Sequence, residues 1–407
     1  MYVGGILSLE GARTTAEVKA RREDKEILRG LGRRVAEIAA LAIQQERKKL
    51  WAISDEVKPT RPLIHICQEP WHELNVNDEL TLRTEGDFCR RIEDFLRKTL
   101  YKWNHMRGDM VVEDVLYSPY VIHDTGFGIT EDVDIAMTDE TSDVVSRRFH
   151  VQIKDDSDVE KIKTPRVRFD KEATEAAFQA MSDIFDGILP VEKRAVEWFW
   201  FDPWDQIVRW TGVEEILTDL ALRPEYVHKI IGRLVDAWLE RLAQYEKLGL
   251  LADHPSKLWG HGAAQIFSEV SPAMHEEFAI NHEIRWYKHW GKNYYGCCEP
   301  LHRKVDICRK IPNLRKISMS PWINFDEAVE NVGSDLVFMM KPNPATLAAE
   351  KWDGEAFRKE LDGKLRKGLA AGCIMEVVLN SVSTVRYQPQ RLWEWARIAS
   401  EVVTQFA

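Results

Sequence analysis

The sequence has no excess of positive charge and no long basic cluster with interleaved aromatic residues. It carries 56 Lys and Arg against 66 Asp and Glu, so the formal net charge is -10 and the pI is near 5.7. A protein that neutralises the phosphates of nucleic acid needs a basic surface. We therefore do not expect nucleic acid as a partner.

Long apolar runs are also missing. No stretch approaches the roughly 18 apolar residues of a membrane-spanning helix, and residues 1–7 lack the charged and apolar regions of a secretory signal. The six cysteines have no regular spacing and include no CxxC pair, so they do not suggest a disulfide framework. We expect a cytoplasmic protein with reduced thiols and no membrane partner.

The chain also lacks a dinucleotide-binding fingerprint. The turn at residues 123–128 contains a single GxG, without the third glycine and the following helix. What the chain does contain is tryptophan, with 15 in 407 residues. Tryptophan buries a large area wherever it is used, so most of these side chains are expected in the core. Those that crowd near strand ends are candidates to line a ligand site.

Strand-like and helix-like segments alternate regularly in the carboxyl-terminal part of the chain. The strands are expected at residues 293–297, 314–318, 336–340 and 373–379. Such alternation predicts parallel strands joined by crossover helices. Earlier candidate strands lie near residues 63, 110, 188 and 258. Eight strands in total is the number that closes a (β/α)8 TIM barrel, and we predict this α/β fold.

The expected domain organisation is an N-terminal helical extension, residues 1–58, followed by the barrel, residues 59–407. Two charged helical runs, at residues 17–29 and 34–51, are expected to lie over the barrel. Residues 130–170 are charged and are predicted to form an insertion.

The most reactive stretch is NYYGCCEPLH, residues 293–302. It predicts a strand that ends in Cys297, Cys298 and Glu299 and is followed by a turn and a short helix. In parallel α/β folds, binding and catalytic side chains lie at the carboxyl ends of strands. Thiolate and carboxylate groups are zinc ligands, so these three residues are candidate metal ligands. The alternative is that one cysteine is a small buried apolar residue and the other belongs to the turn.

Candidate acid–base residues lie near other predicted strands. Glu69, His72 and Glu73 follow the first strand and have groups suited to general acid–base catalysis. The alternative is a loop whose polar groups satisfy one another. Glu376 lies within the last strand, where a carboxylate must find a partner or raise its pKa. Three more side chains near strand ends are candidates to complete a metal site: His123, Glu113 and His261.

Candidate substrate-binding residues are of two kinds. Lys341 and Asn343 follow the strand at residues 336–340, and both can bind a substrate carboxylate, although Asn343 is also a good helix cap. The second kind is aromatic and would shape an apolar pocket. Its members are Trp71, Trp200, Trp204 and Trp322.

Several short segments of the carboxyl-terminal half occur together in one known family. They are Phe201-Asp202-Pro203-Trp204, Arg223-Pro224-Glu225, Gln265-Ile266-Phe267, Val270-Ser271-Pro272, Glu277-Phe278, residues 295–301 and Lys341-Pro342-Asn343-Pro344. In these segments the chain, over roughly residues 180–407, resembles the uroporphyrinogen decarboxylase superfamily, which also holds the cobalamin-dependent methyltransferases. The resemblance implies a single (β/α)8 barrel.

The two branches of this superfamily differ in their functional motifs. The decarboxylases carry an arginine-rich loop after the first strand, whereas residues 68–73 contain no arginine, which argues against porphyrinogen decarboxylation. The methyltransferases carry a His-x-Cys zinc motif after a late strand and a further cysteine after the last strand. Here Tyr295-Gly296-Cys297 stands at the first place, and residues 380–383 contain no cysteine. Only Cys297 carries over directly.

The leading hypothesis is a methyltransferase that moves a methyl group between a small methylated substrate, such as a methoxylated aromatic, and a corrinoid carried by a partner protein. Zinc at the cysteine pair would activate the substrate. The alternative is a metal-free decarboxylase or lyase of the same superfamily, which acts on a carboxylated substrate through the acid–base residues of the first loop. A third hypothesis is a barrel that binds a ligand or a partner without catalysis.

Overall fold

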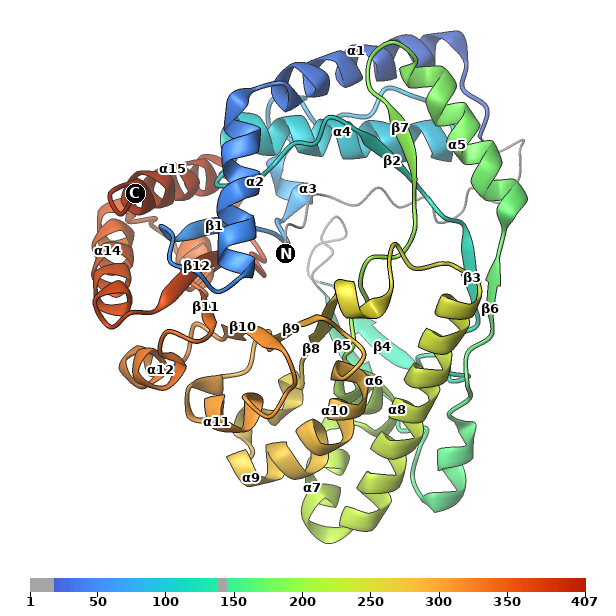
Figure 1. The fold of residues 1–407 in the computed structure, drawn as a ribbon, viewed down its shortest axis with the longest axis vertical. Helices are drawn as coiled ribbons and strands as arrows, with labels where there is room; N and C mark the ends of the chain where they lie inside the picture. Colours follow the sequence, from blue (N-terminus) through green and yellow to red (C-terminus); the bar gives the residue numbers. More distant parts are fainter. Residues whose placement is uncertain (1–17, 138–144) are drawn as a thin grey trace.

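The computed structural model describes residues 18–137 and 145–407, so the first 17 residues of the expected extension lie outside the described residues. The centre of the described structure is a curved, six-stranded parallel sheet with the order β1-β12-β11-β10-β9-β8 (Figure 1). Its strands are β1 (Leu63–Ile66), β8 (Trp259–Gly262), β9 (Lys292–Tyr295), β10 (Leu314–Met319), β11 (Val337–Met340) and β12 (Ile374–Leu379). The first strand of the chain therefore pairs with the last strand, with Leu63 opposite Glu376.

Helices connect the consecutive strands and lie on the outside of this sheet (Figure 1). Between β8 and β9 lie η3 (Gln265–Glu269), α9 (Pro272–His275), the π-helical turn η4 (Glu276–Ile280) and α10 (Asn281–Tyr287). The later connections contain η5 (Leu301–Arg303), α11 (Val305–Cys308), α12 (Phe325–Val332), α13 (Ala345–Ala348) and α14 (Gly354–Ala370), and α15 (Gln390–Thr404) follows β12. The predicted alternation of parallel strands and crossover helices is confirmed here.

Side-chain caps mark where several of these helices begin. Ser271 accepts a hydrogen bond from the backbone of Met274, as expected for a serine that precedes a proline at a helix start. Asn324 caps α12 and Asp353 caps α14 in the same way. These caps satisfy N–H groups that have no partner within the helix.

The first two helices have different surroundings. Helix α1 (Arg22–Ala39) packs on α4 (Asp87–His105) and α5 (Lys171–Phe185), and its Leu28 and Val35 share an apolar cluster with Leu96 and Met181 (Figure 1). Helix α2 (Ala42–Asp55) instead ends at the sheet. This part of the N-terminal extension therefore contributes to the interior.

Side chains at the end of α2 complete a buried ion cluster at the amino-terminal end of the sheet. Lys316 of β10 forms ion pairs of 2.6 Å with both Asp55 and Glu376. Ser54 donates a hydrogen bond of 2.7 Å to the Glu376 carboxylate. The Trp51 ring lies 5.6 Å from the Lys316 ammonium group. Glu376, predicted to need a partner, thus has both a cation and a hydroxyl.

The segment near residue 110, which was predicted to be a strand, is irregular. Residues 109–115 are irregular, and β2 (Leu116–Pro119) begins only at their end and pairs with β7 (Val191–Arg194). Side chains of α2 form hydrogen bonds with backbone groups of this irregular segment. Trp51 donates to the Asp109 carbonyl and Gln44 accepts from the Val112 N–H group, both at 2.9 Å. Because side chains of α2 already satisfy these backbone N–H and C=O groups, the groups do not pair with a neighbouring strand.

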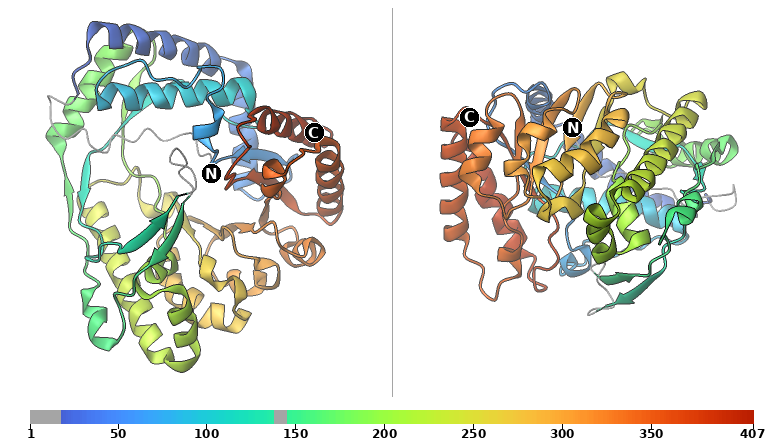
Figure 2. Two further views of the ribbon diagram at one scale, coloured as in Figure 1. Left: turned by 180° about the vertical axis from the view of Figure 1, so that it is seen from behind. Right: turned by 90° about the horizontal axis from the view of Figure 1, so that it is seen from below.

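Residues 120–170 contain the range 130–170 that was predicted to be an insertion, and they form two small antiparallel sheets and a 3-10 helix. These elements are the antiparallel pairs β3 (Ile122–Asp124) with β6 (Val167–Phe169) and β4 (Val133–Ala136) with β5 (Ser146–Phe149), and η1 (Asp156–Lys161). The β4–β5 pair projects from the body of the molecule (Figure 2). Further elements are α3 (Trp71–Leu74), α6 (Pro203–Thr211), α7 (Val213–Leu222), α8 (Pro224–Lys247) and η2 (Pro255–Lys257).

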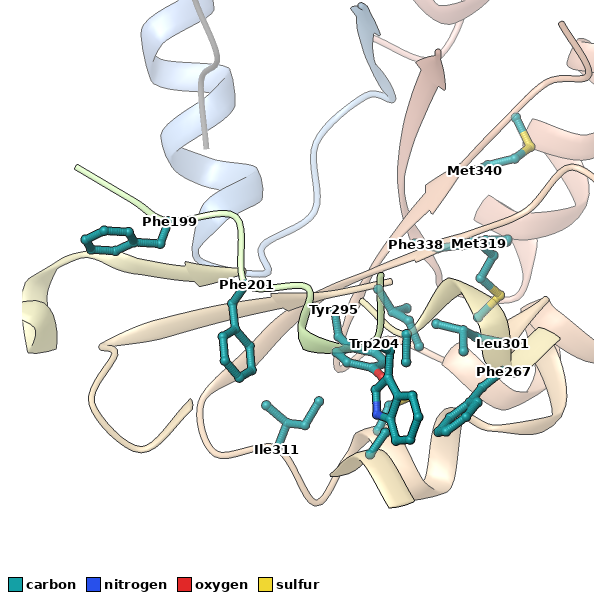
Figure 3. Close-up of a cluster of buried hydrophobic side chains, with 14 of the residues drawn as sticks. Phe199, Phe201, Trp204, Phe267, Tyr295, Leu301, Ile311, Met319, Phe338 and Met340 are labelled. Carbon is teal, nitrogen blue, oxygen red and sulfur yellow. The ribbon is translucent and has the colours of Figure 1, made fainter. Parts of the chain in front are cut away.

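An aromatic core fills the space between the sheet and helices α6, α8 and α10. Phe201 stacks on Trp286 with ring centroids 4.6 Å apart, and both side chains contact Trp238. Trp204 packs on Phe267 at 4.4 Å, and both rings belong to the cluster of Figure 3. Burial of these large rings explains much of the high tryptophan content.

A closed eight-stranded barrel is not shown. In the described parts of the chain, six of the expected strands form one sheet, while β2 and β7 pair with each other in a separate two-stranded sheet. What the structure shows is a mixed α/β fold built on a parallel sheet.

Candidate functional site

The turn after β9 is organised by the Glu299 carboxylate. Glu299 is fully buried, and each of its oxygens accepts a backbone hydrogen bond of 2.7 Å, one from Ala264 after β8 and one from Cys297. Gly296 begins the turn with φ of +95°, and a Cβ atom there would lie 2.3 Å from the Ser318 carbonyl oxygen. Glycine is therefore required by both conformation and space.

The two cysteines of this turn lie together at the carboxyl end of the sheet. Their sulfur atoms are 3.6 Å apart; Cys297 is buried and Cys298 is exposed. The sulfur–sulfur contact raises the pKa of Cys297 and lowers the pKa of Cys298 to about 7. Lys341 donates a hydrogen bond to the Cys297 carbonyl oxygen, and its ammonium nitrogen lies 3.7 Å from the Cys297 sulfur.

Lys341 stands at the centre of this end of the sheet. Only 5% of its surface is exposed, and its charge acts on Cys67 at the end of β1 and on His261 of β8, as well as on the cysteine pair. Within residues 18–137 and 145–407, no carboxylate forms an ion pair with it. Lys316, the other buried lysine of the sheet, has two.

The buried His261 side chain lies within the electrostatic influence of Lys341. Its ring stacks on Trp200 at 4.0 Å and lies 4.5 Å from the ring of Tyr294. His261 is only 1% exposed, and both ring nitrogens lack a hydrogen-bond partner among the described residues. Burial, with a smaller effect of the Lys341 charge, lowers the pKa of His261 to about 3, so the imidazole is neutral.

A carboxyl group with a raised pKa lies two residues after Trp200. Phe201 forms a parallel β-bridge to Gly262, and its side chain lies in the core. Because side chains alternate along an extended segment, those of Trp200 and Asp202 project to the opposite side. Burial, reinforced by the neighbouring Asp205 and opposed by Arg209, raises the pKa of Asp202 to about 7. Asp202 can therefore hold a proton near neutral pH.

The loop after β1 is held by internal contacts. Glu69 pairs with Lys102 at 2.5 Å. Glu73 accepts hydrogen bonds from the Thr384 hydroxyl and from the backbone of Val385 and Tyr387. These contacts tie the loop to the segment after β12. They leave the two carboxylates less available for proton transfer.

His72 lies beside Glu73, with 3.7 Å between its Nε2 atom and the carboxylate, and its buried Nδ1 atom has no partner among the described residues.

The predicted aromatic residues fall into different environments. Trp200 covers His261, and Trp322, in the loop after β10, is 71% exposed. Trp204 is fully buried in the core. Trp71 lies at the start of α3, with its ring 6.0 Å from Tyr101.

The remaining predicted residues are spread over the fold. Asn343 accepts a hydrogen bond from the backbone of Ala345, the capping role that was the alternative to substrate binding. Glu376 lies in the ion cluster at the opposite end of the sheet. His123 pairs with Asp170 at 3.2 Å within the insertion. Burial raises the pKa of Glu113.

The donor geometry does not fit the predicted zinc site. Among the described residues, no group of three or more His, Cys, Asp and Glu side chains is arranged to hold a metal ion. Both Glu299 oxygens are already bound to backbone N–H groups, and the Lys341 cation adjoins the Cys297 sulfur. Two thiols remain, fewer than the three protein ligands of a catalytic zinc. Zinc at this site stays a prediction.

Sequence reasoning gave His261 a minor place and missed Asp202 and Tyr294. A signal for His261 was present in the pattern Gly260-His261-Gly262. A Cβ atom at Gly260 would lie 2.1 Å from Asn293, and one at Gly262 would lie 1.8 Å from the Tyr287 hydroxyl. Two glycines at alternate positions mark a strand face without room for side chains, so the histidine must point to the other face.

Comparison with known proteins adds no relative. No protein-family model and no curated protein matches the chain. In the described ranges, no helix has the length and apolar character needed to cross a membrane. The fold and the site geometry are therefore the basis for assigning a function.

Proposed function

We propose that this chain is a methyltransferase of the uroporphyrinogen decarboxylase superfamily, which moves a methyl group between a small methylated substrate and a corrinoid carried by a partner protein. The observation that carries the proposal is a group of polar and aromatic side chains at the carboxyl end of the sheet. There Lys341, His261 and the thiol pair lie beside Trp200 and a protonatable Asp202. This combination suits a flat substrate whose oxygen must leave as the methyl group departs.

A corrinoid held by the partner protein would supply a cobalt nucleophile for the methyl group. The chain's own residues bind the substrate and supply the proton. Trp200 and Tyr294 offer ring faces to a flat molecule, and the Asp202 carboxyl donates its proton to the substrate oxygen as the carbon–oxygen bond breaks. A pKa near 7 is suited to this donation at neutral pH. The exposed Trp322 at the same edge offers an apolar contact to the partner.

Methylation of free cob(I)alamin by a panel of methoxylated and other methylated donors tests the proposal. At least one donor should give methylcobalamin, followed by its visible absorption. Asp202→Asn should slow the transfer by about 100-fold or more, because it removes the proton donor. Asp306→Asn, at a fully exposed carboxylate, is the matched control and should leave the rate unchanged. No transfer from any donor, or equal rates for the two variants, contradicts the proposal.

A metal-free decarboxylase or lyase is the second candidate. The observation that favours it is Lys341, a buried cation suited to a carboxylated substrate. The residues first expected to do its acid–base chemistry, Glu69 and Glu73, are engaged in other contacts, so this work would fall to Asp202. Release of CO2 from carboxylated members of the panel, without methylation of cobalamin, would favour this candidate.

We also infer that the six-stranded sheet is the larger part of a (β/α)8 barrel. Two observations support this. The first and last strands pair, as they do in such a barrel, and the parallel bridge between Phe201 and Gly262 extends the sheet beyond β8. An experimental structure in which β2 and β7 remain separate from the main sheet would count against it.

A further inference from the structure

Cys297 and Cys298 are two thiols in contact at the carboxyl end of the sheet, and the methyl transfer proposed above gives neither of them a step. Their sulfur atoms lie 3.6 Å apart. The bond length of a disulfide is about 2.05 Å, so a movement of about 1.5 Å would join them. All six cysteines lie in the described residues, and Cys298 alone is exposed. The pair therefore combines one sulfur that solvent reaches with one that is buried beside it.

The turn fixes Cys297 on both sides. Its N–H group donates a hydrogen bond of 2.7 Å to Glu299, and its carbonyl oxygen accepts one from Lys341. The Glu299 carboxylate is in turn held by the backbone N–H group of Ala264 at 2.7 Å. Because these contacts anchor the buried residue, the approach of the two sulfur atoms depends on rotation of the exposed Cys298 side chain. An accessible cysteine beside a second, resolving cysteine is the arrangement typical of redox-sensing sites.

We propose that Cys297 and Cys298 form a redox site, which a hydroperoxide oxidises to a disulfide and a small thiol such as glutathione reduces again. The Cys298 sulfur attacks one peroxide oxygen, the O–O bond breaks, and the other oxygen leaves as water or an alcohol with the thiol proton. The product is a sulfenic acid on Cys298. The Cys297 sulfur then attacks the Cys298 sulfur, the S–O bond breaks, and the hydroxyl group leaves as water with the proton of Cys297. The two sulfur atoms give up two electrons, and the two peroxide oxygens take them.

A disulfide between adjacent residues is easily reversed. The peptide bond between the two cysteines is trans, so their Cα atoms lie about 3.8 Å apart. The two Cα atoms of a disulfide usually lie about 4.4–6.8 Å apart, so this bridge is strained, and strained disulfides are the more readily reduced ones. Two glutathione molecules reduce it. The first releases one cysteine and forms a mixed disulfide with the other, and the second releases that cysteine as glutathione disulfide.

Oxidation of the full, reduced chain by a small excess of hydrogen peroxide tests the proposal. One tryptic peptide, residues 293–303, contains both thiols and no other cysteine. The treatment should remove two thiols per chain, and mass spectrometry should show that this peptide has lost two hydrogen atoms. Glutathione at millimolar concentration should then restore both thiols. The measurement needs no methyl donor and no corrinoid, so its outcome does not depend on the proposed function.

Two single variants separate the roles of the two sulfur atoms. Cys297→Ser lacks the resolving thiol, so its Cys298 should accumulate as the sulfenic acid, which dimedone traps, and then as the sulfinic acid. Cys298→Ser should keep its buried thiol reduced. Cys67→Ser is the matched control, because Cys67 is the one other cysteine that is partly accessible. It should form the same disulfide as the unmodified chain.

Three results from the unmodified chain would overturn the inference. The first is a peptide of residues 293–303 that keeps both thiols after peroxide treatment. The second is oxidation of Cys298 to the sulfinic acid alone, or a disulfide that joins it to another cysteine or to a second chain. The third is a disulfide within the peptide that glutathione does not reduce. Because none of these readouts needs a variant, they decide the question even where a substitution prevents folding.

Discussion

Replacement of Glu299 by alanine tests whether this residue organises the turn or binds a metal. The change removes a buried carboxylate that accepts two backbone hydrogen bonds of 2.7 Å, from Ala264 and Cys297. A hydrogen bond to a charged group contributes about 1.5–3 kcal/mol, so the loss should be about 3–6 kcal/mol. Glu299→Gln keeps one accepting oxygen and should lose about half as much.

The size of the effect in a thermal assay follows from the length of the chain. With 407 residues the unfolding entropy is roughly 0.85 kcal/mol per K, so Glu299→Ala should lower the Tm by about 4–7 °C. Differential scanning calorimetry measures this shift. A wild-type sample treated with a strong chelator is the control, and its Tm should not change if the carboxylate acts through the backbone.

Two results would refute this reasoning. If the Tm of Glu299→Ala stays within about 1 °C of the wild-type value, the two hydrogen bonds do not organise the turn. If the chelator lowers the wild-type Tm as far as the substitution does, Glu299 acts as a metal ligand.

Three further predictions concern other buried groups. Lys316→Met should destabilise the chain by about 3–5 kcal/mol in urea unfolding, because it leaves the Glu376 carboxylate buried without its cation. The double variant Lys316→Met with Glu376→Leu should recover most of this loss. Additive losses in the double variant would contradict the expectation. Gly296→Ala should place a Cβ atom 2.3 Å from the Ser318 carbonyl oxygen, so we expect a lower soluble yield and a lower Tm. An unchanged Tm would show that the turn can relax to accept the side chain. The pKa of Asp202 in the folded chain is raised to about 7. The free energy of unfolding should therefore fall by about 1.4 kcal/mol per pH unit as the pH rises from about 4 to 7, and it should stay level at higher pH. Asp202→Asn should remove this part of the slope, and an unchanged slope would refute the assignment.

The sequence was most informative where each element depends on its own residues. The crossover helices could be predicted because their caps and apolar periodicity are local, as in α12, which begins directly after its cap Asn324. The segment at residues 109–115 is as apolar as a strand, yet its backbone is bound by Trp51 and Gln44 from a distant helix. No local pattern encodes such a partner.

The candidate site divides in the same way. Cys297 and Lys341 could be predicted, because each follows an apolar strand and the carboxyl ends of parallel strands meet. The role of Glu299 could not, since its side chain turns back to bind backbone groups of two loops. Trp200 and Trp204 lie close together in the sequence, and only the packing shows that Trp200 stacks on His261 whereas Trp204 is buried in the core.

The ion cluster at the amino-terminal end of the sheet has a consequence for synthesis of the protein. Ser54 and Glu376 are hydrogen-bonded although 322 residues separate them. While the ribosome is still making the chain, α2 and Lys316 are present before their carboxylate partner in β12. The interior thus remains incomplete until β12 has left the ribosome, and pairings so distant in sequence form slowly. Nascent chains that stop before β12 should be recognised by chaperones and proteases as unfinished, which makes the last strand a checkpoint for the quality of the whole molecule.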